Sequence, residues 1–150
     1  MGNIYDEVDF DNTDFRKQPD KYRVGRGEQG VLMVEPYKSE LLPNWRFKTP
    51  EIAQASADEI YNQYLSYKEQ ADFVGMDMAR KYLQMGYTRA RRYANYPGGK
   101  KYNADGERNE RSIDEQKAKA ASIFEEKWKL VREDENYLKK KHEHQTQYGS

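Results

Sequence analysis

The chain has 150 residues, no cysteine and a formal net charge of zero, because 26 Lys and Arg residues balance 26 Asp and Glu residues. Without cysteine there is no disulfide framework and no thiolate site. No apolar run approaches the roughly 18 residues of a membrane span, and the acidic N-terminus lacks the basic and apolar segments of a secretory signal. We therefore expect one cytoplasmic domain covering residues 1–150 and no membrane partner.

The composition is strongly polar, with 35% charged residues and a mean hydropathy of -1.24. Thirteen Tyr residues supply apolar area that the aliphatic residues do not, and each buried aromatic ring removes a large surface from water. We expect a mainly α fold: a small helical domain of three to four helices with an N-terminal extended arm and a short β-hairpin.

Residues 1–20 predict an acidic extended arm that packs against the domain. The segment contains six acidic side chains and only two basic ones, Arg16 and Lys17. Large apolar side chains are interspersed among them, which favours a packed segment over a free acidic tail; they are Tyr5, Val8, Phe10 and Phe15.

Residues 21–48 predict a hairpin followed by a connector. A glycine-rich turn at 25–30 matches G-x-G-x-x-G and is followed by the apolar run 31–34, which ends before Pro36. A dinucleotide-binding loop must open a helix, whereas this run is typical of a strand. We predict a hairpin that presents Arg26, and the pattern alone assigns no ligand to the turn. The connector contains four expected core anchors: Leu41, Leu42, Trp45 and Phe47.

Residues 49–145 predict the helical body, with helices at about 50–69, 72–95, 112–133 and 134–144 and a frayed tail at 146–150. Thr49 and Pro50 form a helix start, and Pro97 ends the second helix. Residues 112–115 form a capping box. Gly86 inside the second helix costs about 1 kcal/mol relative to Ala, which indicates close packing or a kink there.

Three segments of this chain resemble a family of uncharacterised bacterial and bacteriophage proteins, domain of unknown function 4385. They are YRVGRGEQGVLMVEPYKSELLPNWRFKTPEIA, DFVGMDMARKYLQMGYTRARRYANYPGGKKY and IFEEKWKLVREDENY. The resemblance covers about residues 10–137. It implies a single domain that is expressed inside a bacterial cell, in the host cytoplasm for a phage protein. It implies no catalytic residue and no activity.

The clearest functional signal is a block of positive charge in the second predicted helix and the loop after it. Residues 78–104 contain seven Lys or Arg residues and no acidic residue, with Tyr residues among them. Arg binds phosphate with several donors, and exposed Tyr rings stack on bases. The candidate binding residues are Arg26, Arg80, Lys81, Arg89, Arg91, Arg92, Tyr96, Lys100, Lys101 and Tyr102.

The sequence gives little support for catalysis or metal binding. The two histidines, His142 and His144, lie near the C-terminus, where a solvated tail is the favoured interpretation. Asp72 and Asp77 do not share one helix face and are interpreted as acids at a helix N-terminus. We therefore predict no catalytic residue, no metal site and no cofactor.

Three hypotheses follow from the basic block. The first is a non-enzymatic intracellular protein that binds nucleic acid. The second is a protein-interaction module that meets an acidic partner, for instance a phage-encoded modulator of a host protein. The third is a small carboxylate-dependent enzyme, which requires acids to converge in a pocket beside Arg26 and Arg80. The sequence does not indicate an oligomeric state.

Overall fold

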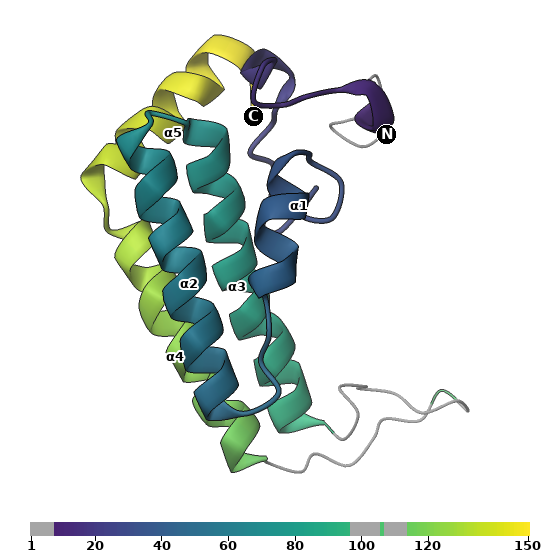
Figure 1. The fold of residues 1–150 in the computed structure, drawn as a ribbon, viewed down its shortest axis with the longest axis vertical. Helices are drawn as coiled ribbons and strands as arrows, with labels where there is room; N and C mark the ends of the chain where they lie inside the picture. The colour runs from purple at the N-terminus through teal and green to yellow at the C-terminus, as the bar shows by residue number, and fades with distance from the viewer. Residues whose placement is uncertain (1–7, 97–105, 107–113) are drawn as a thin grey trace.

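The computed structural model describes residues 8–96, 106 and 114–150. Its α-helices are α1 (Tyr37–Leu41), α2 (Pro50–Glu69), α3 (Phe73–Asn95), α4 (Glu115–Arg132) and α5 (Glu135–Tyr148). Short 3-10 helices lie at Phe10–Asn12, Pro19–Lys21 and Leu42–Asn44. The three long helices α2, α3 and α4 lie side by side as an elongated bundle, and α5 turns away at one end (Figure 1). The mainly α prediction is confirmed, although the described residues form five α-helices where three to four were expected.

Side-chain caps fix where the long helices begin. The Thr49 side chain accepts a hydrogen bond from Ile52 N, as its position before Pro50 predicts. Asp72 caps α3, and Asp134 caps α5. Asp114 caps α4, while the predicted cap Ser112 lies outside the described residues. The last helix continues to residue 148, beyond the predicted end at 144 and into the expected frayed tail.

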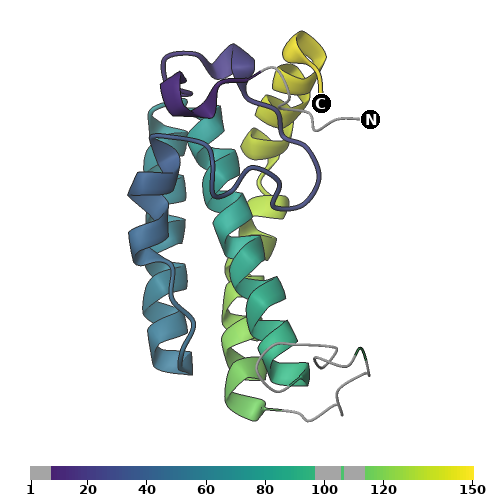
Figure 2. The same ribbon diagram turned by 90° about the vertical axis from the view of Figure 1, so that its right-hand side faces the viewer.

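The predicted β-hairpin is not present in residues 21–35, all of which are described. These residues form successive turns, in which Gly25, Gly27 and Gly30 have positive φ angles. The apolar run buries Val31 and Val34, three residues apart, and leaves the two residues between them exposed. A strand would alternate in steps of two. This turn segment, residues 22–34, crosses the face of α3 (Figure 2).

The arm and connector also differ from expectation. Residues 8–21 contain two 3-10 helices rather than an extended arm, although Phe15 is fully buried and Val8 and Phe10 pack against the core. Tyr5 lies outside the described residues. The connector forms α1 and a 3-10 helix, and its four expected anchors do contact the core: Leu41, Leu42, Trp45 and Phe47.

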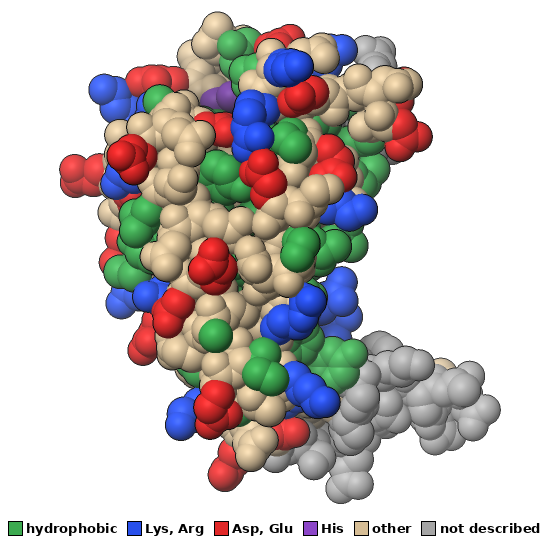
Figure 3. Space-filling view, in the orientation of Figure 1, with side chains coloured by type: hydrophobic (Ala, Val, Ile, Leu, Met, Phe, Trp, Pro, Cys, Tyr) green, Lys and Arg blue, Asp and Glu red, His purple; other side chains and the backbone are tan. Residues whose placement is uncertain are grey.

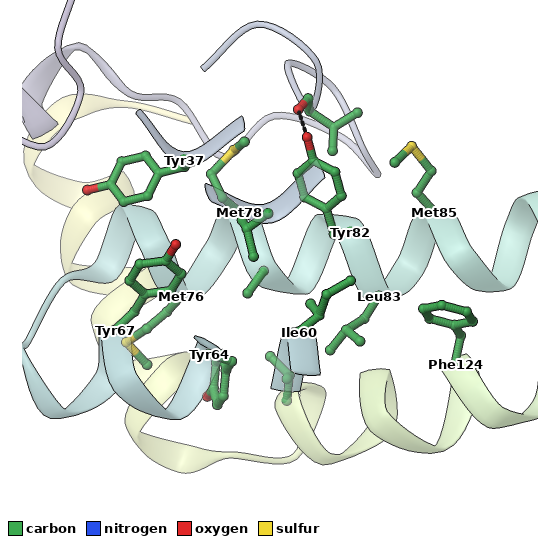
Figure 4. Close-up of a cluster of buried hydrophobic side chains, with 14 of the residues drawn as sticks. Tyr37, Ile60, Tyr64, Tyr67, Met76, Met78, Tyr82, Leu83, Met85 and Phe124 are labelled. Atoms are coloured by element: carbon green, nitrogen blue, oxygen red, sulfur yellow. Dashed lines mark hydrogen bonds between the residues drawn. The ribbon is translucent and has the colours of Figure 1, made fainter. Parts of the chain in front are cut away.

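The core is built around tyrosines from several elements (Figure 4). Tyr22, Tyr37, Tyr64 and Tyr82 are fully buried, and each hydroxyl has a partner, as burial of a polar group demands. The bundle helices approach closely at Gly86, where an added Cβ would lie 2.3 Å from the Phe124 ring. Close packing is therefore the reason for glycine inside α3.

No helix in the described part of the chain is both long enough and apolar enough to cross a membrane.

Candidate functional site

The first half of α3 is buried on every side. All ten residues from 74 to 83 are buried, because α2, α4, α5 and the turn segment together surround this part of the helix. Arg80 and Lys81 are therefore interior side chains, 7% and 0% exposed. The expectation that both side chains are exposed on the polar side of the helix is wrong, since a two-sided helix pattern assumes that one side faces water.

Asp77 organises these buried charges. Its Oδ1 accepts hydrogen bonds from Arg80 Nη2 at 2.8 Å and from the Tyr137 hydroxyl at 2.5 Å. Its Oδ2 accepts a short hydrogen bond from the Tyr22 hydroxyl and lies 3.8 Å from Lys81 Nζ. The carboxylate therefore links α3 to α5 and to the turn segment.

The backbone of the turn segment supplies further acceptors to the two cations. Arg80 Nη1 donates to Gly27 O at 2.6 Å, and Lys81 Nζ donates to Gln29 O at 2.7 Å. The ammonium group also lies 4.8 Å from the centre of the Tyr22 ring, a favourable cation–π distance. These contacts hold the turns against α3, which explains how a segment without strands keeps a defined path.

The cluster holds two cations and a single carboxylate, which leaves one positive charge unbalanced. Burial lowers the pKa of Lys81 to about 8, although Asp77 opposes this shift. Burial would raise the pKa of Asp77, but Arg80, Lys81 and the two tyrosine hydroxyls outweigh it and lower that pKa to about 2. Near neutral pH all three groups are therefore charged.

A cavity of about 220 Å³ opens beside Arg80, between the turn segment, α3, α4 and α5. None of the described residues that line it is acidic, and three of them are cations. Next to it, Arg132 lies over the Trp128 ring at 4.0 Å, and Trp128 contacts Tyr87 with ring centres 5.7 Å apart. The lining residues are Val24, Gly25, Gly27, Arg80, Gln84, Trp128, Arg132, Tyr137, Leu138 and Lys141.

The other candidate binding residues are spread over the surface. Arg26, Arg89 and Arg92 are exposed, and Arg91 and Tyr96 are half-buried. Lys and Arg side chains gather around the C-terminal end of α3 in Figure 3. Three further candidates lie outside the described residues: Lys100, Lys101 and Tyr102.

Arg91 connects the two groups of candidates. It follows Arg80 by eleven residues, so at about 100° per residue it returns to nearly the same side of α3, about 16 Å farther along. Gln84 and Thr88 lie between them on this side, and Thr88 Oγ1 donates to the Glu28 carboxylate at 2.5 Å. The cavity and the half-buried Arg91 thus share one side of α3, whereas the exposed Arg89 and Arg92 do not lie on it.

Sequence reasoning missed Trp128, Arg132 and Lys141, which lie far from the basic block along the chain. It also misplaced His144, which is not solvated: this side chain is 7% exposed, and its Nε2 lies 2.7 Å from Tyr22 O. The spacing of Asp77, Arg80 and Lys81 at i, i+3 and i+4 was a usable signal, because it favours ion pairing on a helix.

Among the described residues, no acidic side chain lines the cavity beside Arg80. Both oxygens of Asp77 are engaged by Arg80 and by tyrosine hydroxyls. Within residues 8–96, 106 and 114–150, no group of three or more His, Asp or Glu side chains is placed to hold a metal ion. The arrangement instead offers cationic donors to an anion, with the Trp128 ring beside them.

The chain belongs to the family described as a domain of unknown function (DUF4385), whose sequence profile matches residues 5–147. No curated protein and no solved structure matches this chain.

Proposed function

We propose that this member of the DUF4385 family binds nucleic acid through a basic face made by the turn segment, α3, α4 and α5. The observation that carries the proposal is the cavity beside Arg80, which is lined by three cations and no described acid. The basic face consists of Arg26, Arg80, Tyr87, Arg91, Trp128, Arg132 and Lys141.

The basic face offers the two kinds of contact that nucleic-acid binding requires: donors to phosphate oxygens and an aromatic surface for the bases. Arg132 and Lys141 offer donors to phosphate oxygens from two different helices. Trp128 is half-buried and is supported by Arg132, which lies over its ring at 4.0 Å, and by a tilted contact with the Tyr87 ring. A base can stack beside such a supported ring at a small entropic cost, and each stacked base contributes about 1–3 kcal/mol. The face therefore favours unpaired bases over duplex.

Glu28 is an acidic side chain near this face, since it accepts a hydrogen bond from Thr88 on α3. It does not line the cavity. Its position between the cavity and Arg91 favours two separate phosphate contacts over a continuous basic groove.

The test is fluorescence anisotropy with labelled single-stranded and double-stranded oligonucleotides and the double variant Arg132→Gln with Lys141→Gln. We expect single strands to bind more tightly than duplex, and the variant to lose about tenfold or more in affinity. The matched control is Lys17→Gln with Lys38→Gln, which removes the same charge from residues that do not line the cavity. Equal affinity of both variants and the unchanged protein would contradict the proposal.

An acidic protein partner is the second candidate for the same face. Leu138 favours it, because this apolar side chain lines the cavity and is 46% exposed. Competition with an unlabelled oligonucleotide separates the two candidates. It displaces a bound nucleic acid, whereas a complex with an acidic protein persists and is lost only in the Leu138→Ser variant.

A further inference from the structure

We propose that the cavity beside Arg80 is a pocket for one phosphate monoester group. The inference deepens the proposed function and rests on it, because the monoester would be the terminal phosphate of a nucleic-acid strand. Inorganic phosphate carries the same chemistry and serves as the simplest probe.

The first observation is an unused donor on a buried side chain. A guanidinium has five N–H groups. In Arg80, Nε donates to Asp77 and Tyr137, and Nη1 donates to Gly27 O and Gln84 Oε1. Nη2 has one acceptor, Asp77 Oδ1, for its two N–H groups. Arg80 lines the cavity while being only 7% exposed, so a bound oxygen is the natural acceptor for the remaining N–H.

The second observation is the charge balance around the cavity. The buried cluster keeps one positive charge beyond the single carboxylate of Asp77, and Arg132 and Lys141 add two more at the cavity wall. An uncompensated buried charge is unfavourable. A monoester carries about −1.5 to −2 charges near pH 7, so it neutralises this excess better than a phosphodiester with a single charge.

The third observation is the size of the cavity. Its volume of about 220 Å³ is below the range of about 300–1,000 Å³ in which proteins enclose drug-sized ligands. The space suits one phosphoryl group and not a whole nucleotide. A monoester can end inside such a pocket, whereas a diester must continue on both sides of its phosphorus atom.

The rigidity of the pocket supports a preformed site. Arg80 is fixed by Asp77, Gln84 and Gly27 before any ligand arrives, and Asp77 is in turn held by Tyr22 and Tyr137. Preorganised donors lose little conformational entropy on binding. This distinguishes Arg80 from the exposed cations of α3, which must be ordered by the ligand.

The experiment compares one short single-stranded oligonucleotide with a 5′-phosphate, a 3′-phosphate or only hydroxyl ends, each labelled internally, in anisotropy titrations. Inorganic phosphate is added as a competitor. We expect one phosphorylated form to bind about tenfold more tightly than the hydroxyl form, an advantage of the size that charge-assisted hydrogen bonds provide. Arg132→Gln with Lys141→Gln should remove this preference, and the Lys17→Gln and Lys38→Gln control should keep it.

The outcomes separate this inference from the proposed function. If all three oligonucleotides bind equally and phosphate does not compete, the protein binds nucleic acid but the pocket is not a monoester site. A second outcome is that calorimetry detects phosphate binding, that the Arg132→Gln with Lys141→Gln variant loses this binding, and that no oligonucleotide binds. In that case the pocket binds phosphate, and the nucleic-acid proposal fails. If nothing binds, both are overturned.

Discussion

Asp77 is the single carboxylate that contacts the two buried cations of α3 within the described residues. Its side chain is fully buried, and its partners come from α3, α5 and the turn segment. A buried ion pair adds little net stability compared with an apolar pair of the same shape, but removal of one partner leaves the other charge unpaired. The structure therefore depends on this carboxylate more than on any exposed acid.

We predict that Asp77→Asn destabilises the fold by about 3–5 kcal/mol, because Arg80 and Lys81 lose their counter-charge. Urea denaturation measures this difference. Asp58→Asn is the matched control, since Asp58 pairs with Lys127 while its side chain is 49% exposed, and it should cost less than about 1 kcal/mol. A change below 1 kcal/mol in Asp77→Asn would show that the buried charges are not energetically coupled.

Lys81 gives the cluster a pH dependence. Burial lowers its pKa from 10.5 to about 8 in the folded protein. Below pH 8 both the folded and the unfolded chain hold this proton. Between pH 8 and about pH 10 the unfolded chain binds it more firmly, so the free energy of unfolding increases as pH rises. Above about pH 10 the ionisation of tyrosines in the unfolded chain opposes the trend.

The corresponding prediction compares the unchanged protein with Lys81→Met. The stability of the unchanged protein should rise between pH 8 and 10, and the variant should lose this rise, because Met fills a similar volume without a titratable group. Urea denaturation at several pH values measures both slopes. The charged and titratable groups that face Lys81 are Asp77 and Arg80 on α3 and Tyr22 on the turn segment, and the variant keeps all three. Parallel slopes would show that Lys81 keeps an ordinary pKa.

At the scale of elements, the contact between α3 and α4 depends on the absence of a side chain. An added Cβ at Gly86 would lie 2.3 Å from the Phe124 ring, which is fully buried. At Gly75 an added Cβ would lie 2.4 Å from the Tyr67 ring. Close-packed interiors have no space for extra atoms of this size. Two aromatic rings therefore fix how near α2 and α4 come to α3.

We predict that Gly86→Ala destabilises the protein by about 1–3 kcal/mol, because the cost of overpacking exceeds the gain of roughly 1 kcal/mol in helix propensity. Thermal and urea denaturation measure the change. Gly86→Ala combined with Phe124→Leu should be more stable than the sum of the two single changes predicts, since the smaller side chain makes room for the new methyl group. Stabilisation by Gly86→Ala alone would indicate that the helices separate without cost.

At the scale of the whole molecule, opposite charges cancel and binding must be local. The formal net charge is zero, and acidic and basic side chains are mixed over the face seen in Figure 3. Long-range attraction to a polyanion is therefore weak. Under the proposed function, affinity for nucleic acid comes from the basic face, and especially from side chains that reach phosphate directly.

This fixes the expected salt dependence of the proposed binding. Each phosphate neutralised on a single strand contributes about −0.7 to the slope of log affinity against log salt. The accessible cations of the basic face, which are Arg26, Arg91, Arg132 and Lys141, would give a slope of about −3 at most. Arg132→Gln with Lys141→Gln should make this slope shallower by about 1.4. A slope steeper than −5 would require cations outside this face.

Local patterns in the sequence were enough to place the long helices. Thr49 followed by Pro50 predicts the start of α2 because capping acts within one turn. Gly86 predicts close packing or a kink, because glycine is unfavourable inside a helix. Tyrosine-rich composition with zero net charge predicts a folded chain with a Tyr-rich core. Each of these inferences depends on neighbours within a few residues or on the chain as a whole.

Only the tertiary structure decided which charges are buried and which meet. Arg80 and Lys81 belong to the basic block by sequence, yet Asp77 and the turn segment enclose them, because chain far from α3 in sequence covers its polar side. Arg132 and Lys141 reach the cavity from helices that sequence analysis did not connect with Arg80. Burial and side-chain convergence arise from contacts between distant segments, and one-dimensional periodicity holds no information about them.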